Sequence, residues 1–230
     1  MRSVTAAPQE RQGRPEAPSA PVSQADRAYA AIQDRLIMLD LPPLEPIDEV
    51  RLMEALEMGR TPVREALKRL EGDRLVVSYP RRGTFATGVD ITDLAYISEI
   101  RCELEPLAAF RAAETAGAHA RAELGELADE TDGLDVRSME RGELMRWDLR
   151  VHRAIYRASG NHYLEDSLVR YNNLATRIFC LFLDRMEHFD RHVGEHTALL
   201  RAIALRRPDE AEHLAHEHVV GFEKAVRAVI

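Results

Sequence analysis

The histidines of this 230-residue chain are concentrated in its C-terminal half, where eight of the nine lie between residues 152 and 218. Asp148 and His152 are one helical turn apart, on a stripe of apolar residues expected to face a protein core. His196 and His218 lie on similar apolar stripes of later segments. A polar side chain on a buried face is costly unless it has a partner. One aspartate and three histidines converging from three helices would form a site for a divalent transition metal.

The spacing of these histidines also allows other interpretations. A histidine on an apolar face is often a hydrogen-bonded core residue, and Asp148 could simply bond His152. His192 is four residues from His196 and is an alternative ligand. The histidines that we expect to be exposed are His188, His213 and His216. Imidazole suits Zn, Ni, Cu, Fe or Mn, so spacing alone leaves both the site and its metal open.

A second group of residues that could do chemistry is a short basic segment, residues 60–82. The whole chain has a formal net charge of −8 and a pI of about 5.6, which argues against a protein coated with basic charge. Residues 60–82, however, hold seven basic and three acidic side chains, a balance of +4. Such a cluster can be a solvated helix face, and the pattern within it decides between that and a DNA contact.

The elements predicted around the basic segment would present it on a winged helix-turn-helix. They are a helix from Asp26 to before Leu41, a helix over 48–57, a helix from Thr61, and strands over 75–79 and 84–87 joined by a turn at 80–83. On the third helix, Arg60, Arg64 and Lys68 are four residues apart and form one exposed stripe, with Thr61 at the helix N-terminus. Arginines there can reach guanine edges or phosphates.

The turn between the two strands carries two further arginines. Arg81 and Arg82 at the tip of this hairpin could enter the minor groove or hold the DNA backbone. Recognition helix and turn therefore agree in favouring DNA binding over a solvated face.

The segments 60–71 (Arg-Thr-Pro-Val-Arg-Glu-Ala-Leu-Lys-Arg-Leu-Glu) and 80–83 (Pro-Arg-Arg-Gly) resemble the DNA-binding module of the GntR family of bacterial transcription regulators. The similarity spans about residues 27–88. It implies that Arg60, Thr61, Arg64 and Gly83 contact DNA. Two departures are Gly59, where the family often has serine, and Arg74, where it usually has glycine; neither removes the main contacts.

The region after Asp90 is predicted to be an antiparallel helical bundle. The expected helices are 92–117, 119–132, 138–158, 161–185, 188–206 and 208–228. The fold class is thus mainly α, with a β-hairpin wing in the N-terminal part. The expected division is a disordered tail over 1–25, a DNA-binding domain over 26–89 and an effector-binding and dimerisation domain over 90–230.

Short motifs in the bundle resemble the FCD ligand-binding domain of FadR-type GntR regulators. They are Ile100 to Ala108, Asp148 to His152, Ser159 to Asn161, Glu195-His196 and Ala211 to His218. Members with one aspartate and three histidines hold a metal at the bundle centre. The resemblance implies that Asp148, His152, His196 and His218 are the ligands here, with zinc or nickel the preferred metal.

A metal with open positions can accept a carboxylate from a small organic acid, and Arg101 could pair with that carboxylate as a planar fork. The spacing equally allows an ordinary Arg101–Glu105 pair. Asn173 and Arg177 on a later helix are further candidates for the effector cavity, with plain helix surface as their alternative.

These features predict a bacterial transcription regulator rather than an enzyme. It would act as a repressor, bind a pseudo-palindromic DNA operator as a homodimer, and respond to a small organic acid. A metal-dependent hydrolase and a pure metal sensor are the alternatives. Two cysteines, no secretory signal and no apolar run of transmembrane length indicate a cytoplasmic protein with no membrane partner.

Overall fold

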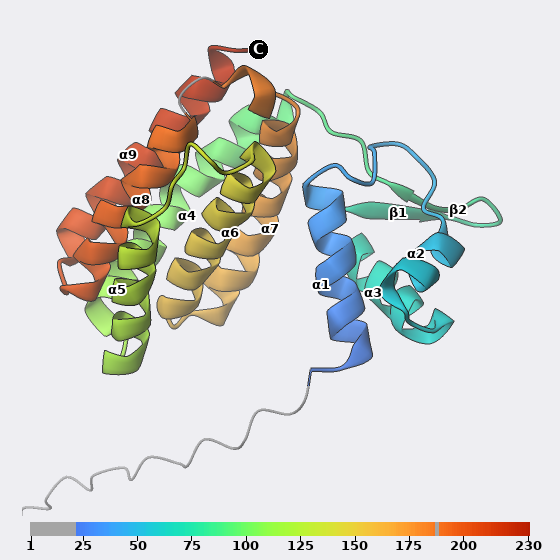
Figure 1. Cartoon of the computed structure of the whole chain (residues 1–230), viewed down its shortest axis with the longest axis horizontal. Coiled ribbons are helices and arrows are strands. Elements are labelled where there is room, and N and C mark those ends of the chain that lie inside the picture. The colour runs from blue at the N-terminus through green and yellow to red at the C-terminus, as the bar shows by residue number, and fades with distance from the viewer. Residues whose placement is uncertain (1–21, 187–188) are drawn as a thin grey trace, which may run out of the picture.

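A computed structural model describes residues 22–186 and 189–230. A winged-helix part and a helical bundle lie side by side (Figure 1). The winged-helix elements are α1 (Gln24–Ile37), α2 (Glu49–Leu56), α3 (Arg60–Gly72), β1 (Val76–Tyr79) and β2 (Gly83–Ala86). The bundle elements are α4 (Asp93–Thr115), α5 (Ala118–Asp132), α6 (Arg141–Ala158), α7 (His162–Cys180), the 3-10 turn η1 (Leu183–Arg185), α8 (Phe189–Ala204) and α9 (Pro208–Arg227). The prediction of a mainly helical winged-helix protein is confirmed.

The winged-helix part is held together by the apolar stripes of α1 and α3. Ile32 and Leu36 of α1 pack with Val63 and Leu70 of α3, and all four are fully buried. Helix α1 begins at Gln24, two residues earlier than expected, because the side chain of Ser23 accepts a hydrogen bond from the Asp26 amide. The expected tail over 1–25 therefore overlaps α1, and residues 1–21 lie outside the described residues.

The hairpin forms the wing that the sequence predicts. Val76 pairs with Ala86 and Tyr79 with Gly83 in antiparallel register. The turn needs a left-handed backbone at two positions, Arg81 with φ 64° and Gly83 with φ 93°. Glycine reaches that region without steric cost, which explains its place at the end of the turn.

In the bundle, α4 packs along α9 and α5 along α8, while α6 and α7 lie next to each other. The expected continuous helix over 161–185 is interrupted after Cys180, where η1 follows. Arg141 of α6 donates from Nη1 to the carbonyl oxygen of Met186, 2.6 Å away, and to that of Leu183. Carbonyl oxygens at the end of a helix have no partner within the helix. The Arg141 side chain supplies hydrogen bonds to two such oxygens, which lets the chain leave the helical path after η1. Each described helix is too polar or too short to serve as a membrane span.

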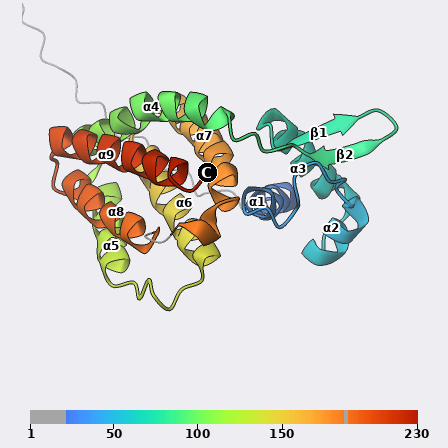
Figure 2. The same ribbon diagram turned by 90° about the horizontal axis from the view of Figure 1, so that it is seen from above.

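The two parts meet where α1 lies against the bundle, between α7 and the rest of the winged-helix part (Figures 1 and 2). Arg146 of α6 makes an ion pair with Asp34 of α1, with Nη2 and Oδ2 3.1 Å apart. Arg177 of α7 donates from Nη1 to the Thr87 hydroxyl at 2.6 Å and from Nη2 to the Thr87 carbonyl at 2.7 Å. Thr87 follows β2 directly, so α7 is bonded to the start of the linker.

Replacing Arg177 by methionine tests this attachment. Hydrogen bonds from a charged donor contribute about 1.5–3 kcal/mol, so we expect amide hydrogen exchange over residues 87–92 to accelerate by about tenfold or more. The control is Arg170→Met, an exposed arginine on the same helix. Equal amide exchange rates over residues 87–92 in the two variants would show that Arg177 does not stabilise the linker.

Candidate functional site

Four side chains from three helices meet at the centre of the bundle. They are Asp148 and His152 of α6, His196 of α8 and His218 of α9, and all are buried. Nε2 of His152 lies 3.4 Å from Nε2 of His196 and 3.3 Å from Nε2 of His218. Oδ1 of Asp148 lies 3.6 Å from Nε2 of His196. One ligand atom from each residue thus lies within 4.8 Å of the other three.

The ring of His152 is oriented from behind by a buried ion pair. Its Nδ1 atom lies 3.0 Å from Oε2 of Glu105, whose Oε1 accepts from Nε of Arg101 at 2.6 Å. Burial alone would lower the pKa of His152, but the carboxylates of Glu105 and Asp148 raise it. A carboxylate behind a histidine is the usual way to fix a metal ligand's tautomer and raise its basicity.

His196 and His218 are held in the neutral form that a metal requires. Burial and the neighbouring imidazoles keep the pKa of both rings well below the ordinary histidine value. Nδ1 of His196 lies 3.2 Å from the Val193 carbonyl oxygen, which can only accept. The proton therefore resides on Nδ1, and the Nε2 lone pair points to the centre of the cluster.

Among the described residues, two buried atoms of the cluster have no hydrogen-bond partner, Oδ1 of Asp148 and Nδ1 of His218. A buried carboxylate oxygen without a donor is costly. A cation at the centre would satisfy this oxygen together with the imidazole nitrogens. The donor set, one carboxylate and three imidazoles, fits a divalent transition metal, so the cluster could bind one.

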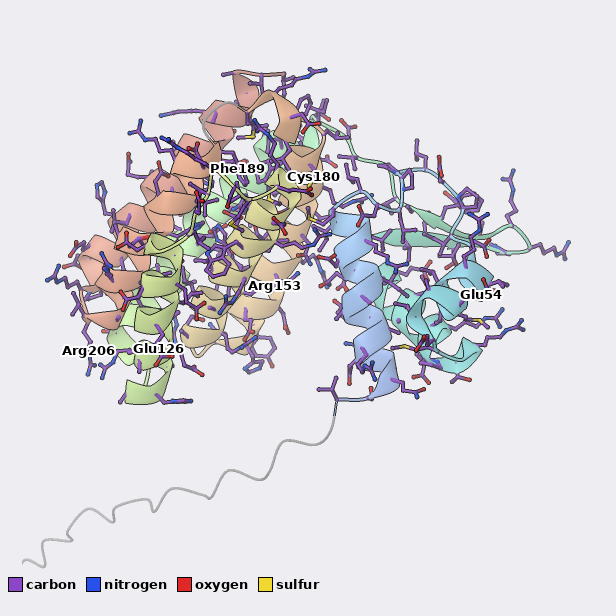
Figure 3. The ribbon with its side chains drawn as sticks, in the orientation of Figure 1. Glu54, Glu126, Arg153, Cys180, Phe189 and Arg206 are labelled. Carbon is purple, nitrogen blue, oxygen red and sulfur yellow. The ribbon has the colours of Figure 1, made fainter. Side chains whose placement is uncertain are left out.

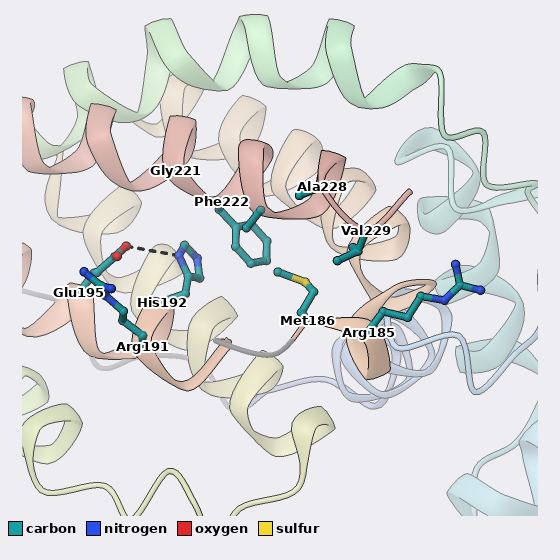
Figure 4. A pocket seen from close by; sticks show the side chains of 10 residues that line it. Arg185, Met186, Arg191, His192, Glu195, Gly221, Phe222, Ala228 and Val229 are labelled. Atoms are coloured by element: carbon teal, nitrogen blue, oxygen red, sulfur yellow. Dashed lines mark ion pairs between the residues drawn. The ribbon is translucent and has the colours of Figure 1, made fainter.

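His192 and Glu195 line a cavity of about 460 Å³ (Figure 4). Both residues also contact members of the cluster. Nε2 of His192 is 3.7 Å from Oδ1 of Asp148, and its Nδ1 is 3.4 Å from Oε2 of Glu195. The adjacent imidazoles of His192 and His218, each with Nδ1 3.4 Å from Oε2 of Glu195, lower the pKa of Glu195 to about 2. Arg185 and Arg191 also line the cavity and give it positive charge.

The three candidate effector residues do not gather in one place. Arg101 is buried beside the cluster and makes the Glu105 pair that its spacing also allowed. Asn173 accepts from Arg153 at 3.2 Å, and Arg177 bonds Thr87, so the structure places both toward the winged-helix part rather than beside the cluster. Helical spacing could not reveal this, because it does not say which neighbour a helix face meets.

The remaining histidines divide as follows. His213 and His216 are exposed, as expected, and His188 lies outside the described residues. His192 lies at the edge of the cluster.

The residues expected to contact DNA belong to two elements of the winged-helix part, α3 and the wing. Arg60, Thr61, Arg64 and Lys68 of α3 and Arg81, Arg82 and Gly83 of the wing are all exposed. Nε of Arg64 lies 2.9 Å from Oε2 of Glu49 in α2, an exposed pair. Exposed pairs contribute little stability, so Arg64 can exchange its partner for a phosphate or a base at small cost.

Several functional neighbours were missed in the sequence analysis. They are Glu105 as the partner of His152, Glu195, Arg185 and Arg191. Glu105 had a signal, because it sits four residues from Arg101 on an expected core face. The two arginines had none, because they come from η1 and the start of α8, and no local pattern shows that these segments line a cavity together with the C-terminal part of α9.

The sequence matches two family models. Residues 24–86 match the bacterial regulatory proteins of the gntR family, and residues 96–221 match the FCD domain. The FCD match alone covers more than half of the chain.

Curated relatives carry regulator names. The HTH-type transcriptional repressor GlaR of Escherichia coli is 26% identical over 199 residues, which are 84% of this chain and 90% of that protein. The Nta operon transcriptional regulator of Aminobacter aminovorans is 28% identical over 178 residues, 77% of this chain and 82% of that protein. An uncharacterized HTH-type regulator of Agrobacterium vitis is 34% identical over 140 residues, 58% of this chain and 81% of that protein.

Solved structures share the fold. E. coli McbR/YncC superimposes with a TM-score of 0.78 at 22% identity, over 90% of this chain and 99% of that chain. A GntR regulator from Rhodococcus sp. RHA1 gives a TM-score of 0.66 at 20% identity, over 90% and 99% of the two chains. Together with the family matches, these similarities place the chain in the GntR family of bacterial transcription regulators, among the FadR-type members that carry an FCD domain.

Proposed function

We propose that the protein is a cytoplasmic, homodimeric repressor. Its affinity for its operator would be controlled by a small organic acid that binds beside a metal in the bundle. Residues 26–89 would bind DNA, and residues 90–230 would bind the effector and dimerise. The observation that carries the proposal is the convergence of Asp148, His152, His196 and His218 in the same chain as the winged helix.

The ligands of the proposed metal are those four residues, with zinc or nickel preferred because three imidazoles and one carboxylate suit both. When bound, such a metal supplies a Lewis-acid position to which a carboxylate can attach. Glu105 orients His152, and Arg101 holds Glu105 in place. His192 stands at the edge of the site toward the cavity and is the alternative ligand.

The organic acid would enter through the cavity of Figure 4. Arg185 and Arg191 line it and can attract an anion, and Phe222 supplies apolar surface. Arg101 is a further candidate to meet the effector carboxylate. An acid that binds one conformation of the bundle better than another shifts the population toward that conformation. The Arg177–Thr87 attachment would carry the shift to the linker and the winged helix.

DNA would be read by α3 and the wing. Each subunit presents one recognition helix, so a dimer would read the two halves of a pseudo-palindromic operator. The residues proposed to contact DNA are Arg60, Thr61, Arg64, Lys68, Arg81, Arg82 and Gly83. Affinity that rests on a few arginines per subunit should fall steeply with salt.

This function can be tested by thermal unfolding of the full-length protein. The melting temperature is measured with each member of a panel of organic and sugar acids, with and without zinc or nickel. A ligand stabilises the folded state according to its concentration relative to Kd. We expect at least one acid to raise Tm only when metal is present, and to change DNA retention in a gel shift. An acid effect that is independent of metal would contradict the proposal. Metal alone controlling DNA binding, with no acid active, would establish a pure metal sensor instead.

A further inference from the structure

A row of arginines lies on the face of α6 that points away from the metal-site residues. Arg150, Arg153 and Arg157 are three and four residues apart, so they share one face of the helix. Asp148 and His152 lie on roughly the opposite face. The three arginines line a cavity of about 360 Å³ between α5 and α6, a size typical of small-molecule pockets.

Two of these arginines already have acidic partners at the rim. Nη2 of Arg150 lies 2.8 Å from Oε2 of Glu130, and Nε of Arg157 lies 3.9 Å from Oε1 of Glu165. Both pairs are exposed and therefore contribute little stability. Glu123 also lines the cavity, and its carboxylate is 3.4 Å from Nε2 of His119.

Arg153 is the central residue of the row and is labelled in Figure 3. It differs from the other two arginines in its partners. It is partly buried, and among the described residues its hydrogen bonds run from Nη2 to the neutral amide oxygens of Gln33 and Asn173, each at 3.2 Å. No carboxylate of a described residue lies within ion-pair distance of it. Burial accordingly lowers the pKa of Arg153. A desolvated guanidinium without a counter-ion is unfavourable, and a bound anion would relieve that cost.

Apart from the three arginines and Glu123, the side chains that line the cavity are apolar. Leu124 and Leu127 of α5 and Ala154 of α6 contribute side chains to its wall. An apolar wall beside a cationic group matches a ligand with an apolar body and a negatively charged head. We propose that the cavity between α5 and α6 is a second ligand site, for a small organic carboxylate whose head binds Arg153 and whose body contacts Leu124 and Leu127.

This site is connected to the recognition helix by hydrogen bonds. Arg153 donates to Gln33 of α1, Nε2 of Gln33 donates to the Tyr29 hydroxyl at 2.6 Å, and that hydroxyl donates to Oδ2 of Asp73 at 2.7 Å. Asp73 caps the C-terminus of α3. A carboxylate that binds the Arg153 guanidinium competes with Gln33 for its hydrogen bond. Ligand binding would therefore change the contacts that position α1 and α3, and this effect does not require the metal. The site stands independently of the function proposed above.

The single tryptophan provides a probe of this site. Trp147 is stacked by Arg150, whose Cζ is 4.6 Å from the ring centroid, and its Nε1 donates to Thr131 of α5 at 3.1 Å. We expect octanoate to change Trp147 fluorescence in a saturable way. Neither 1-octanol, which lacks the charge, nor inorganic phosphate, which lacks the apolar body, should do so over the same concentrations.

Variants of the full-length protein show which residues bind octanoate. Arg153→Met should raise the Kd for octanoate at least tenfold, and Arg153→Lys should restore part of the affinity, since the charge is kept. The matched control is Arg201→Met, an exposed arginine of α8 paired with Asp129 and Asp132, which should leave Kd unchanged. His196→Ala should also leave Kd unchanged, which separates this site from the metal cluster.

Three results would overturn the proposal. The first is an equal octanoate Kd in Arg153→Met and the unsubstituted protein. The second is loss of octanoate binding in His196→Ala, which would place the ligand at the metal cluster. The third is a change of oligomeric state in Arg153→Met by sedimentation, which would make the cavity an interface between copies of the chain.

Discussion

A protein in which His196 and His218 are both replaced by alanine is expected to lose its metal. The substitutions remove two of the three imidazoles whose Nε2 atoms meet at the bundle centre. A carboxylate and one imidazole cannot hold a divalent ion against dialysis as four ligands can. We expect metal content by elemental analysis to fall from about one ion per chain to less than about a tenth of that, and the organic-acid response to disappear.

The matched control is a double variant in which His213 and His216, two exposed histidines of α9, are both replaced by alanine. It should leave metal content and effector response intact. Because His196 is fully buried, its loss can also weaken packing. Asp148→Asn keeps the side-chain shape and removes the negative charge, and it should lower metal affinity while circular dichroism shows unchanged helix content. Full metal occupancy in the double variant would show that the four residues are not the ligand set.

Arg64→Ala is expected to cause the largest loss of operator affinity. Arg64 is exposed near the N-terminal end of α3, and within the described residues its ion pair is the exposed contact with Glu49. A good arginine contact with a base contributes about 1–3 kcal/mol, so each half-site should lose roughly 5- to 150-fold in affinity. Fluorescence anisotropy with an operator selected from random DNA measures this loss.

Arg69→Ala is the control for Arg64. Arg69 lies on the same helix but faces α1, where it pairs with Asp26 at 2.7 Å and stacks over Tyr29 at 4.1 Å. Its removal should change operator affinity little. Dimerisation by sedimentation and metal content should be the same in both variants. An unchanged affinity in Arg64→Ala would mean that α3 is not the recognition helix.

The helices and the hairpin could be predicted from the sequence because their signals are local. Apolar spacing marks the buried face of α3, and Gly83 marks a turn that requires positive φ. The break after Cys180 could not be predicted, because the segment that follows it is held by hydrogen bonds from Arg141, in a distant part of the chain, to the carbonyl oxygens of Leu183 and Met186. A local pattern contains no information about such a distant donor.

The candidate metal cluster could be predicted for a similar reason. Its members lie on core-facing stripes of three helices, and a bundle brings such stripes together. The partners around the cluster were harder to predict. Glu105 lies on α4, and the match between its carboxylate and His152 depends on the relative rotation of α4 and α6. The rotation of α7 is likewise not encoded in helical spacing, so the sequence could not show that Asn173 and Arg177 face the winged-helix part.

The most direct test of the proposed metal centre is X-ray absorption spectroscopy at the metal edge of the full-length, metal-loaded protein. Three imidazoles and one carboxylate predict a first shell of nitrogen and oxygen at about 2.0–2.2 Å, with the outer-shell signature of histidine rings and no sulfur. The double histidine variant should remove that shell, because it is expected to lose the metal. A sulfur shell at about 2.3 Å, which would implicate Cys102 or Cys180, or a first shell without imidazole, would contradict the metal centre proposed for this bundle.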